Sequence, residues 1–186
     1  MPARDDPETT HPIVIRTAEV EDGVAIHRLV RDSRVLDLNS LYSYLLVCRH
    51  FGDTCVVAQA RDEETADDVV GFVTAFKPPA DPRTVFVWQV AVDASMRGRG
   101  LARRLLVELL ALPACRDVRW LETTVTPDNE ASRALFHSLA RSLGTRCEVS
   151  PYFGEELIAG GDHEIEELHR IGPIPGHGPR TRPSKE

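Results

Sequence analysis

Two arginines alternate with two glycines at Arg97-Gly98-Arg99-Gly100, after the apolar run 84–93 and before an amphipathic run that begins at residue 101. This order predicts a strand, a tight turn and a helix. The first turn of a helix presents free N–H groups and the positive end of the helix dipole, which attract an anion. Glycine lets the main chain approach that anion closely, and arginine adds charge beside it. The stretch therefore predicts a phosphate or pyrophosphate site.

Two better-known phosphate-binding motifs do not fit this stretch. The dinucleotide fingerprint G-x-G-x-x-G matches Gly98 and Gly100 but fails at its third glycine, where Arg103 stands. The P-loop pattern G-x-x-x-x-G-K-[ST] is absent from the sequence. An ordinary strand-to-helix turn with surface arginines stays open as the alternative, because such turns are common.

The surrounding patterns predict the elements that position this turn. Strands are expected at 13–18, 54–60, 69–77, 84–93, 118–125 and 147–153, and helices at 20–33, 37–51, 101–112 and 128–144. An antiparallel meander followed by alternating strands and helices predicts an α/β domain with a mixed sheet and helices on both faces. The domain is expected at residues 13–173, between a flexible lead at 1–12 and a flexible tail at 174–186.

Charge and composition narrow the class of protein. The 186 residues are 42% hydrophobic with a formal net charge of −7, which argues against nucleic acid as the main partner. No apolar stretch approaches the ~20 residues of a membrane span, and residues 1–12 lack the apolar region of a signal peptide. These features predict no membrane partner and a cytoplasmic location.

The four cysteines are Cys48, Cys55, Cys115 and Cys147. They form no C-x-x-C pair, and no nearby histidine completes a zinc pattern. We therefore expect reduced thiols that pack as small apolar residues, and the sequence alone predicts no metal site. Histidines 27, 50, 137 and 169 are expected to be structural or surface residues.

The glycine stretch and its flanks resemble the GNAT acetyltransferases. Residues 97–102 fit the pattern [QR]-x-x-G-x-[GA] of that family's acyl-CoA pyrophosphate loop, and 126–140 resemble its second CoA-contacting helix. The resemblance implies the GNAT acyl-CoA N-acyltransferase fold, with acetyl-CoA as co-substrate and a sheet that splays at a bulge. The main chain at 90–92 is then expected to pair with pantetheine, and one amide to stabilise the oxyanion. The implied cofactor contacts are Val90, Ala91, Val92, Arg97, Gly98, Arg99, Gly100, Leu101, Ala102, Asn129 and Ser132.

A narrower resemblance, to the L-2,4-diaminobutyrate acetyltransferases of ectoine synthesis, rests on segments 37–51, 86–93, 121–136 and 162–173. It implies transfer of acetyl from acetyl-CoA to the side-chain (N4) amine of L-2,4-diaminobutyrate. The product would be N4-acetyl-L-2,4-diaminobutyrate, formed by direct attack in a ternary complex. A homodimer and a role in osmotic stress are also implied. Another amine acceptor and a non-catalytic CoA-binding sensor stay open as alternatives.

A diamino acid needs partners for a carboxylate and for two amines. Carboxylates hold ammonium groups, polar side chains bind either end, and an aromatic ring can wall the pocket or face a cation. The candidates are Asp37, Asn39, Tyr42, Tyr44, Trp88, Thr123 and Glu164. Simpler interpretations stay open: Asp37 as a helix cap, the aromatic side chains as core, and residues 163–164 as a solvated acidic stretch. Glu122 points toward or away from the site according to strand parity.

The reaction requires two proton transfers. An alkylammonium is protonated at neutral pH and must lose a proton before attack, for which Glu164 and His163 are the candidate bases. Many GNAT enzymes use a tyrosine of the second CoA helix to protonate the departing thiolate. Phe136 occupies that position here, so either another donor or water is expected to serve, or the step needs no dedicated acid.

Overall fold

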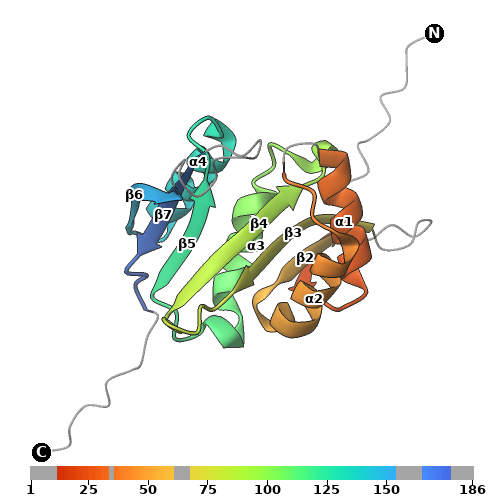
Figure 1. The fold of residues 1–186 in the computed structure, drawn as a ribbon, viewed down its shortest axis with the longest axis horizontal. Coiled ribbons are helices and arrows are strands. Elements are labelled where there is room, and N and C mark those ends of the chain that lie inside the picture. The colour runs from red at the N-terminus through yellow and green to blue at the C-terminus, as the bar shows by residue number, and fades with distance from the viewer. Residues whose placement is uncertain (1–11, 34–35, 61–67, 154–164, 177–186) are drawn as a thin grey trace, which may run out of the picture.

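The computed structural model describes residues 12–33, 36–60, 68–153 and 165–176. Within them, a seven-stranded sheet runs in the order β1-β2-β3-β4-β5-β7-β6 (Figure 1). The strands are β1 (Ile13–Thr17), β2 (Val56–Ala60), β3 (Asp68–Phe76), β4 (Thr84–Val92), β5 (Trp120–Val125), β6 (Arg146–Phe153) and β7 (Glu166–Gly172). Neighbouring strands are antiparallel except for β4 and β5, so the predicted mixed sheet is confirmed.

In the described residues, α-helices cover both faces of this sheet (Figure 1). They are α1 (Asp22–Ser33), α2 (Leu41–Phe51), α3 (Leu101–Ala111) and α4 (Glu130–Ser142), and short 3-10 turns lie at Gly52–Thr54, Ala94–Met96 and Pro113–Cys115. Helices α1 and α2 pack over one core, which contains Ile26, Tyr44 and Phe72. Helices α3 and α4 pack over the other, which contains Leu105 and Phe136. In the described part of the chain, no helix combines the length and apolar character needed to span a membrane.

Side-chain caps fix where two of the helices begin. The Ser40 hydroxyl oxygen accepts a hydrogen bond from the Ser43 N–H at 3.2 Å, which starts α2 at Leu41. The Asn129 side-chain oxygen accepts one from the Ser132 N–H at 3.0 Å and starts α4 in the same way. Ser40 is thus the cap of α2, and the alternative role of Asp37 as that cap is wrong.

The last strand, β7, is missing from the predicted elements. Glutamate, histidine and arginine side chains interrupt the apolar alternation over residues 166–172, which removes the usual strand signal. In the fold, β7 lies between β5 and β6 and pairs antiparallel with both. Strand β6 is therefore an edge of the sheet.

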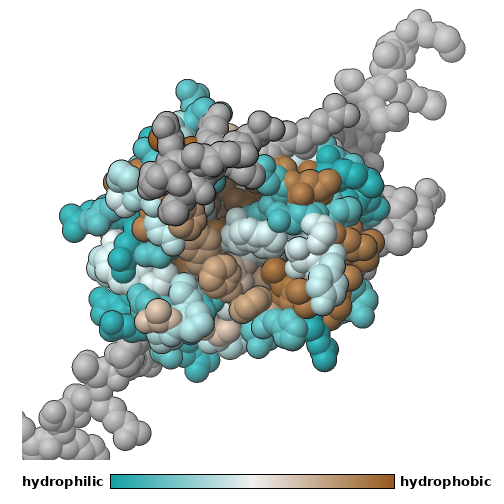
Figure 2. Space-filling view, viewed as in Figure 1, coloured by the Kyte–Doolittle hydropathy of each residue, from teal (hydrophilic) through white to brown (hydrophobic). Residues whose placement is uncertain are grey.

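Strands β4 and β5 separate along their length (Figure 1). Their parallel ladder joins Thr84–Phe86 to Trp120–Glu122. The register between β3 and β4 then shifts, so that Trp88 is an extra residue between Val87 and Gln89. Trp88, one of the candidate substrate-binding residues, therefore lies in the bulge itself. In Figure 2, apolar side chains gather in the middle of the viewed face, over β4 and β5.

Candidate active site

Two adjoining cavities follow the end of β4 toward the first turn of α3. The first encloses about 290 Å³ and is lined by Ser33, Leu36, Val90, Ala91, Val92, Arg97, Ala102, Asn129, Ala131, Ser132 and Leu135. The second encloses about 620 Å³ and is lined by Val92, Met96, Arg97, Gly98, Arg99, Gly100, Leu101, Ala102, Arg103, Ala131, Ala134, Leu135 and Ser138. Because the two share five lining residues, they form one continuous trough.

The glycine turn at the end of the trough has the geometry of an anion site. Gly98 and Gly100 have φ of 74° and 72°, in the left-handed region that side-chain-bearing residues disfavour by roughly 1–2 kcal/mol. A β-carbon on either would meet no atom within 4 Å, so backbone conformation is what requires glycine here. Gly100 is the N-cap of α3, and its carbonyl accepts from the Arg104 N–H at 3.1 Å. The earlier N–H groups of the helix, from Leu101 onward, lie where the second cavity opens.

Short polar contacts hold the chain between β4 and the turn. The Asp93 side-chain oxygen accepts from the Ser95 N–H at 2.9 Å and from the Ser95 hydroxyl at 2.6 Å. The Ser95 hydroxyl, followed by its N–H, holds the pKa of the Asp93 carboxyl below its usual value. Arg97 donates from Nε to the Val92 carbonyl at 3.2 Å. The Arg97 guanidinium is therefore fixed beside the end of β4, within the lining of both cavities.

The eleven residues implied as cofactor contacts all line the trough, seven in the first cavity and the remaining four in the second. Several other residues of the lining were not among the predicted contacts. Leu135 lies three residues after the predicted contact Ser132 and four after Ala131, on the same face of α4, so helical periodicity was a usable signal. Ser33 and Leu36 come from the end of α1 and the segment after it, where the sequence offers no comparable signal.

The segment before α2 is fastened to β4 by a chain of hydrogen bonds. Tyr44 has no exposed surface, and its hydroxyl donates to Gln89 Oε1 at 3.1 Å. Gln89 Nε2 donates to the Asp37 carbonyl at 3.0 Å, and the Asn39 N–H donates to the Tyr44 hydroxyl at 3.4 Å. The Tyr44 ring stacks on Trp88 with centroids 5.7 Å apart. Four of the residues predicted to bind the acetyl acceptor thus meet around the buried Gln89, at positions 37, 39, 44 and 88.

The structure does not bring the other predicted acceptor residues to this group. Tyr42 is 68% exposed on the outer side of α2. Thr123 is buried, and its hydroxyl donates to the Thr124 carbonyl at 3.4 Å. Because side chains alternate along β5, Glu122 lies on the face of the sheet opposite to that of Thr123. There it forms an ion pair with Arg170 at 3.3 Å. The candidate bases at 163 and 164 lie outside the described residues.

Helix α4 presents no tyrosine to the trough. Phe136 is 1% exposed within the core, while Leu135 lines both cavities. The hydroxyl groups in the lining of the first cavity belong to Ser33 and Ser132. A tyrosine hydroxyl on α4 is therefore unavailable as a proton donor.

The cysteines are free thiols that show no sign of activation as nucleophiles. Burial raises the pKa of Cys48 and Cys115 to about 11 and that of Cys55 to about 12. Burial raises the pKa of Cys147 as well. All four are therefore protonated at neutral pH, as expected of small apolar packing residues.

Comparisons with known proteins agree with this geometry. Residues 24–140 match the Acetyltransferase (GNAT) family. The chain is 50% identical over 162 residues to an L-2,4-diaminobutyric acid acetyltransferase of Halalkalibacterium halodurans, an alignment that covers 87% of this chain and 82% of the relative. It is 52% identical over 162 residues to the protein of the same name in Marinococcus halophilus, with 87% and 91% covered.

A solved structure extends the similarity to the fold. It is the diaminobutyrate acetyltransferase EctA from Paenibacillus lautus, in complex with its substrate L-2,4-diaminobutyric acid and coenzyme A. The superposition has a TM-score of 0.81 at 43% sequence identity and covers 88% of this chain and 96% of that one. The similarity therefore extends well beyond the glycine turn, into the elements that carry both sides of the candidate site.

Proposed function

The chain belongs to the GNAT acetyltransferase family and, within it, to the L-2,4-diaminobutyric acid acetyltransferases, and we propose that it transfers acetyl from acetyl-CoA to L-2,4-diaminobutyrate. The observation that carries this proposal is the continuous trough between the splayed strand β4 and helix α4. The similar EctA structure holds coenzyme A and the diamino acid together, which supports a ternary complex here.

Acetyl-CoA is the co-substrate that this trough suits. Its pyrophosphate would lie on the first turn of α3, against the main chain of 97–102 and the guanidinium groups of Arg97 and Arg99. Its pantetheine would run along Val90–Val92 as an added strand, with Asn129 and Ser132 on the other side. One amide of this stretch would then donate to the thioester oxygen as negative charge develops on it.

The acceptor would approach from the side of the Asp37–Asn39 segment and Trp88. The Asp37 carboxylate suits an ammonium group, and the Trp88 ring supplies an aromatic wall. The Tyr44 hydroxyl is already engaged by Gln89 and the Asn39 N–H, so its role in this proposal is to position that segment. Tyr42 and Thr123 stay in the proposal as hydrogen-bonding residues.

The reaction is a direct attack of the N4 amine on the thioester carbonyl carbon. The ammonium form first gives up a proton, for which His163 or Glu164 is the proposed base. The neutral nitrogen forms the new C–N bond, the C–S bond breaks, and the coenzyme leaves as a thiolate. The nitrogen, which is positively charged after the attack, gives up one proton to water and becomes the neutral amide. Phe136 has no hydroxyl and is buried, so water is the proposed source of the proton for the thiolate.

Three further properties belong to this proposal. The product, N4-acetyl-L-2,4-diaminobutyrate, would serve ectoine synthesis under osmotic stress. The four free thiols support a reducing, cytoplasmic location. A homodimer is supported by the edge strand β6, which leaves the apolar residues Val149, Tyr152 and Phe153 exposed. Light scattering coupled to size-exclusion chromatography would measure its mass, and a monomer at assay concentration would contradict it.

The test is an assay with acetyl-CoA and a set of amines. Thiol release is followed for L-2,4-diaminobutyrate, ornithine, lysine, spermidine and a peptide with a free N-terminus, and the acetylated nitrogen is located by NMR. We expect rapid release with diaminobutyrate, acetyl on the side-chain nitrogen, and little turnover with the others. Preferred turnover of another amine would overturn the acceptor. Acetyl-CoA binding without any turnover would instead support a sensor.

A further inference from the structure

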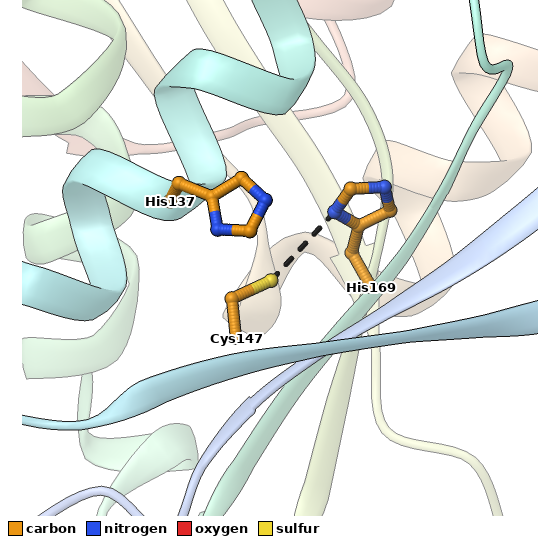
Figure 3. Close-up of side chains that lie close together, drawn as sticks. All are labelled: His137, Cys147 and His169. Atoms are coloured by element: carbon orange, nitrogen blue, oxygen red, sulfur yellow. Dashed lines mark hydrogen bonds between the residues drawn. The ribbon is translucent and has the colours of Figure 1, made fainter.

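Outside the trough, three side chains with metal-binding atoms converge beneath α4 (Figure 3). His137 comes from α4, Cys147 from β6 and His169 from β7, and one ligand atom of each lies within 4.8 Å of the others. The sheet register explains the convergence. Cys147 pairs with Ile171, which is two residues from His169 on β7, so both side chains project from the same face of the sheet. Helix α4 packs on that face and adds the imidazole of His137.

The spacing of these atoms suits one zinc ion. The Cys147 Sγ lies 3.6 Å from His169 Nδ1. Zn–S and Zn–N bonds of about 2.3 Å and about 2.0–2.1 Å, at a tetrahedral angle, hold sulfur and nitrogen about 3.6 Å apart. Cysteine and histidine are also the ligands that zinc prefers in proteins. We propose that His137, Cys147 and His169 bind one Zn²⁺, with water as the fourth ligand.

The surroundings of the cluster support ligation. His169 has no exposed surface, and an imidazole ring in its neutral form offers a lone pair to a metal. The Cys147 thiol would lose its proton to solvent on binding. Arg133, one helical turn before His137, is a cation that acts electrostatically on Cys147 and His169, and it is paired with Glu167 of β7. The pairing neutralises the positive charge that would otherwise oppose a metal ion at this place.

A hydrogen bond alone does not account for the cluster. A bond between the Cys147 sulfur and His169 Nδ1 explains two of the three side chains, and His169 Nε2 still has no partner among the described residues. It leaves unexplained why His137 also turns toward them, with its ring 5.9 Å from that of His169. Neither cavity of the trough is lined by any of the three, so the ion would cross-link α4, β6 and β7 rather than take part in acetyl transfer.

The first experiment uses the full chain, reduced and freed of metal by a chelator, and titrates it with Co²⁺ as a spectroscopic probe. We expect saturation at one equivalent with an absorption band from thiolate-to-cobalt charge transfer, and loss of that band on adding Zn²⁺. Zinc at about 100 times its Kd should raise the thermal midpoint by about 5–10 °C. Failure of the wild-type protein to give a saturable cobalt band would overturn the site.

Variants identify the ligands. His137→Ala keeps a good helix former on α4 and is expected to weaken zinc binding by about 100-fold or more, as is Cys147→Ala. Cys48→Ala removes a buried thiol beneath the opposite face and should keep the cobalt band unchanged. If the band survives in Cys147→Ala, the thiolate belongs to another cysteine and the site is wrong. Metal binding is read directly, so this result is independent of whether diaminobutyrate is the acceptor.

Discussion

The two parts of the proposed site, the coenzyme trough and the hydrogen-bonded segment before α2, are constructed by different means. On the coenzyme side, residues 90–102 form one continuous stretch whose main chain supplies most of the predicted contacts. On the acceptor side, Tyr44 reaches Gln89 across 45 positions of the sequence, and Gln89 reaches Asp37 across 52. A main-chain site depends on local conformation and charge, whereas a site held by buried side chains depends on every hydrogen bond in the chain of contacts. Substitutions in one part should therefore change the KM for one substrate and leave the KM for the other unchanged.

The largest effect is expected on the coenzyme side. Arg99→Glu replaces an attractive charge beside the proposed pyrophosphate with a repulsive one, which should raise the KM for acetyl-CoA by about 30-fold. The KM for diaminobutyrate should stay within about twofold of wild type if the two sides are independent. Steady-state kinetics with each substrate varied in turn measure both values.

Arg116→Glu is the matched control, because it makes the same charge change at an exposed position that lines neither cavity. Its kinetic constants should equal those of the wild type. An equal rise of both KM values in Arg99→Glu would contradict the separation of the two sides.

On the acceptor side, Tyr44→Phe removes one hydroxyl from the buried chain of hydrogen bonds. Gln89 Oε1 and the Asn39 N–H lose their partner, which should lower the free energy of unfolding by about 1–2 kcal/mol. Release of the Asp37–Asn39 segment should also raise the KM for diaminobutyrate by about 10-fold and leave that for acetyl-CoA unchanged. Urea denaturation and steady-state kinetics measure the two effects.

The stability control for that variant is Tyr42→Phe, on the same helix. Its side chain is largely exposed, so loss of its hydroxyl should leave the free energy of unfolding unchanged. Equal destabilisation by the two substitutions would mean that the buried hydrogen bonds do not fasten the acceptor side.

A smaller, pH-dependent effect is expected at Ser95. Ser95→Ala removes the hydroxyl whose hydrogen bond contributes most to the lowered pKa of Asp93. The pKa of Asp93 is lower in the folded state than in the unfolded state. Its carboxylate therefore stabilises the fold at pH values above its unfolded pKa of about 3.9, and this stabilisation is lost as the pH falls through its folded pKa. The variant should be less stable by about 0.5 kcal/mol at neutral pH. Urea denaturation should show this difference shrinking as the pH is lowered toward about 3. A difference that stays constant with pH would show that Asp93 is not its source.

The smallest effect is expected from thiol modification. The pKa values of about 11 to about 12 keep Cys48, Cys55 and Cys115 protonated and unreactive at neutral pH. Brief treatment of the native enzyme with iodoacetamide should leave its activity unchanged, whereas the urea-unfolded chain should be alkylated at all four cysteines. Mass spectrometry counts the adducts. Rapid labelling of native Cys48 would show that the core beneath α1 and α2 opens more readily than its burial indicates.

The sequence by itself determined the coenzyme side of this protein. Glycines at 98 and 100, the serine and asparagine caps, and the helical and strand periodicities act through contacts within a few residues, so their consequences are visible in the sequence. For that reason the sequence predicted the strand-turn-helix at 84–111. The family resemblance added eleven proposed coenzyme contacts, which line the trough. Segment-level resemblance likewise indicated the family.

Only the tertiary structure decided the rest. The charged strand β7, the bulge at Trp88 and the partnership of Tyr44 with Gln89 depend on which strands the sheet places side by side. The convergence of His137, Cys147 and His169 depends on the pairing of β6 with β7, because the three residues come from α4, β6 and β7 respectively. Such contacts join residues tens of positions apart, and no local spacing rule specifies them. Their physical origin is the packing of whole elements, which fixes strand order, register and the helix that covers each face.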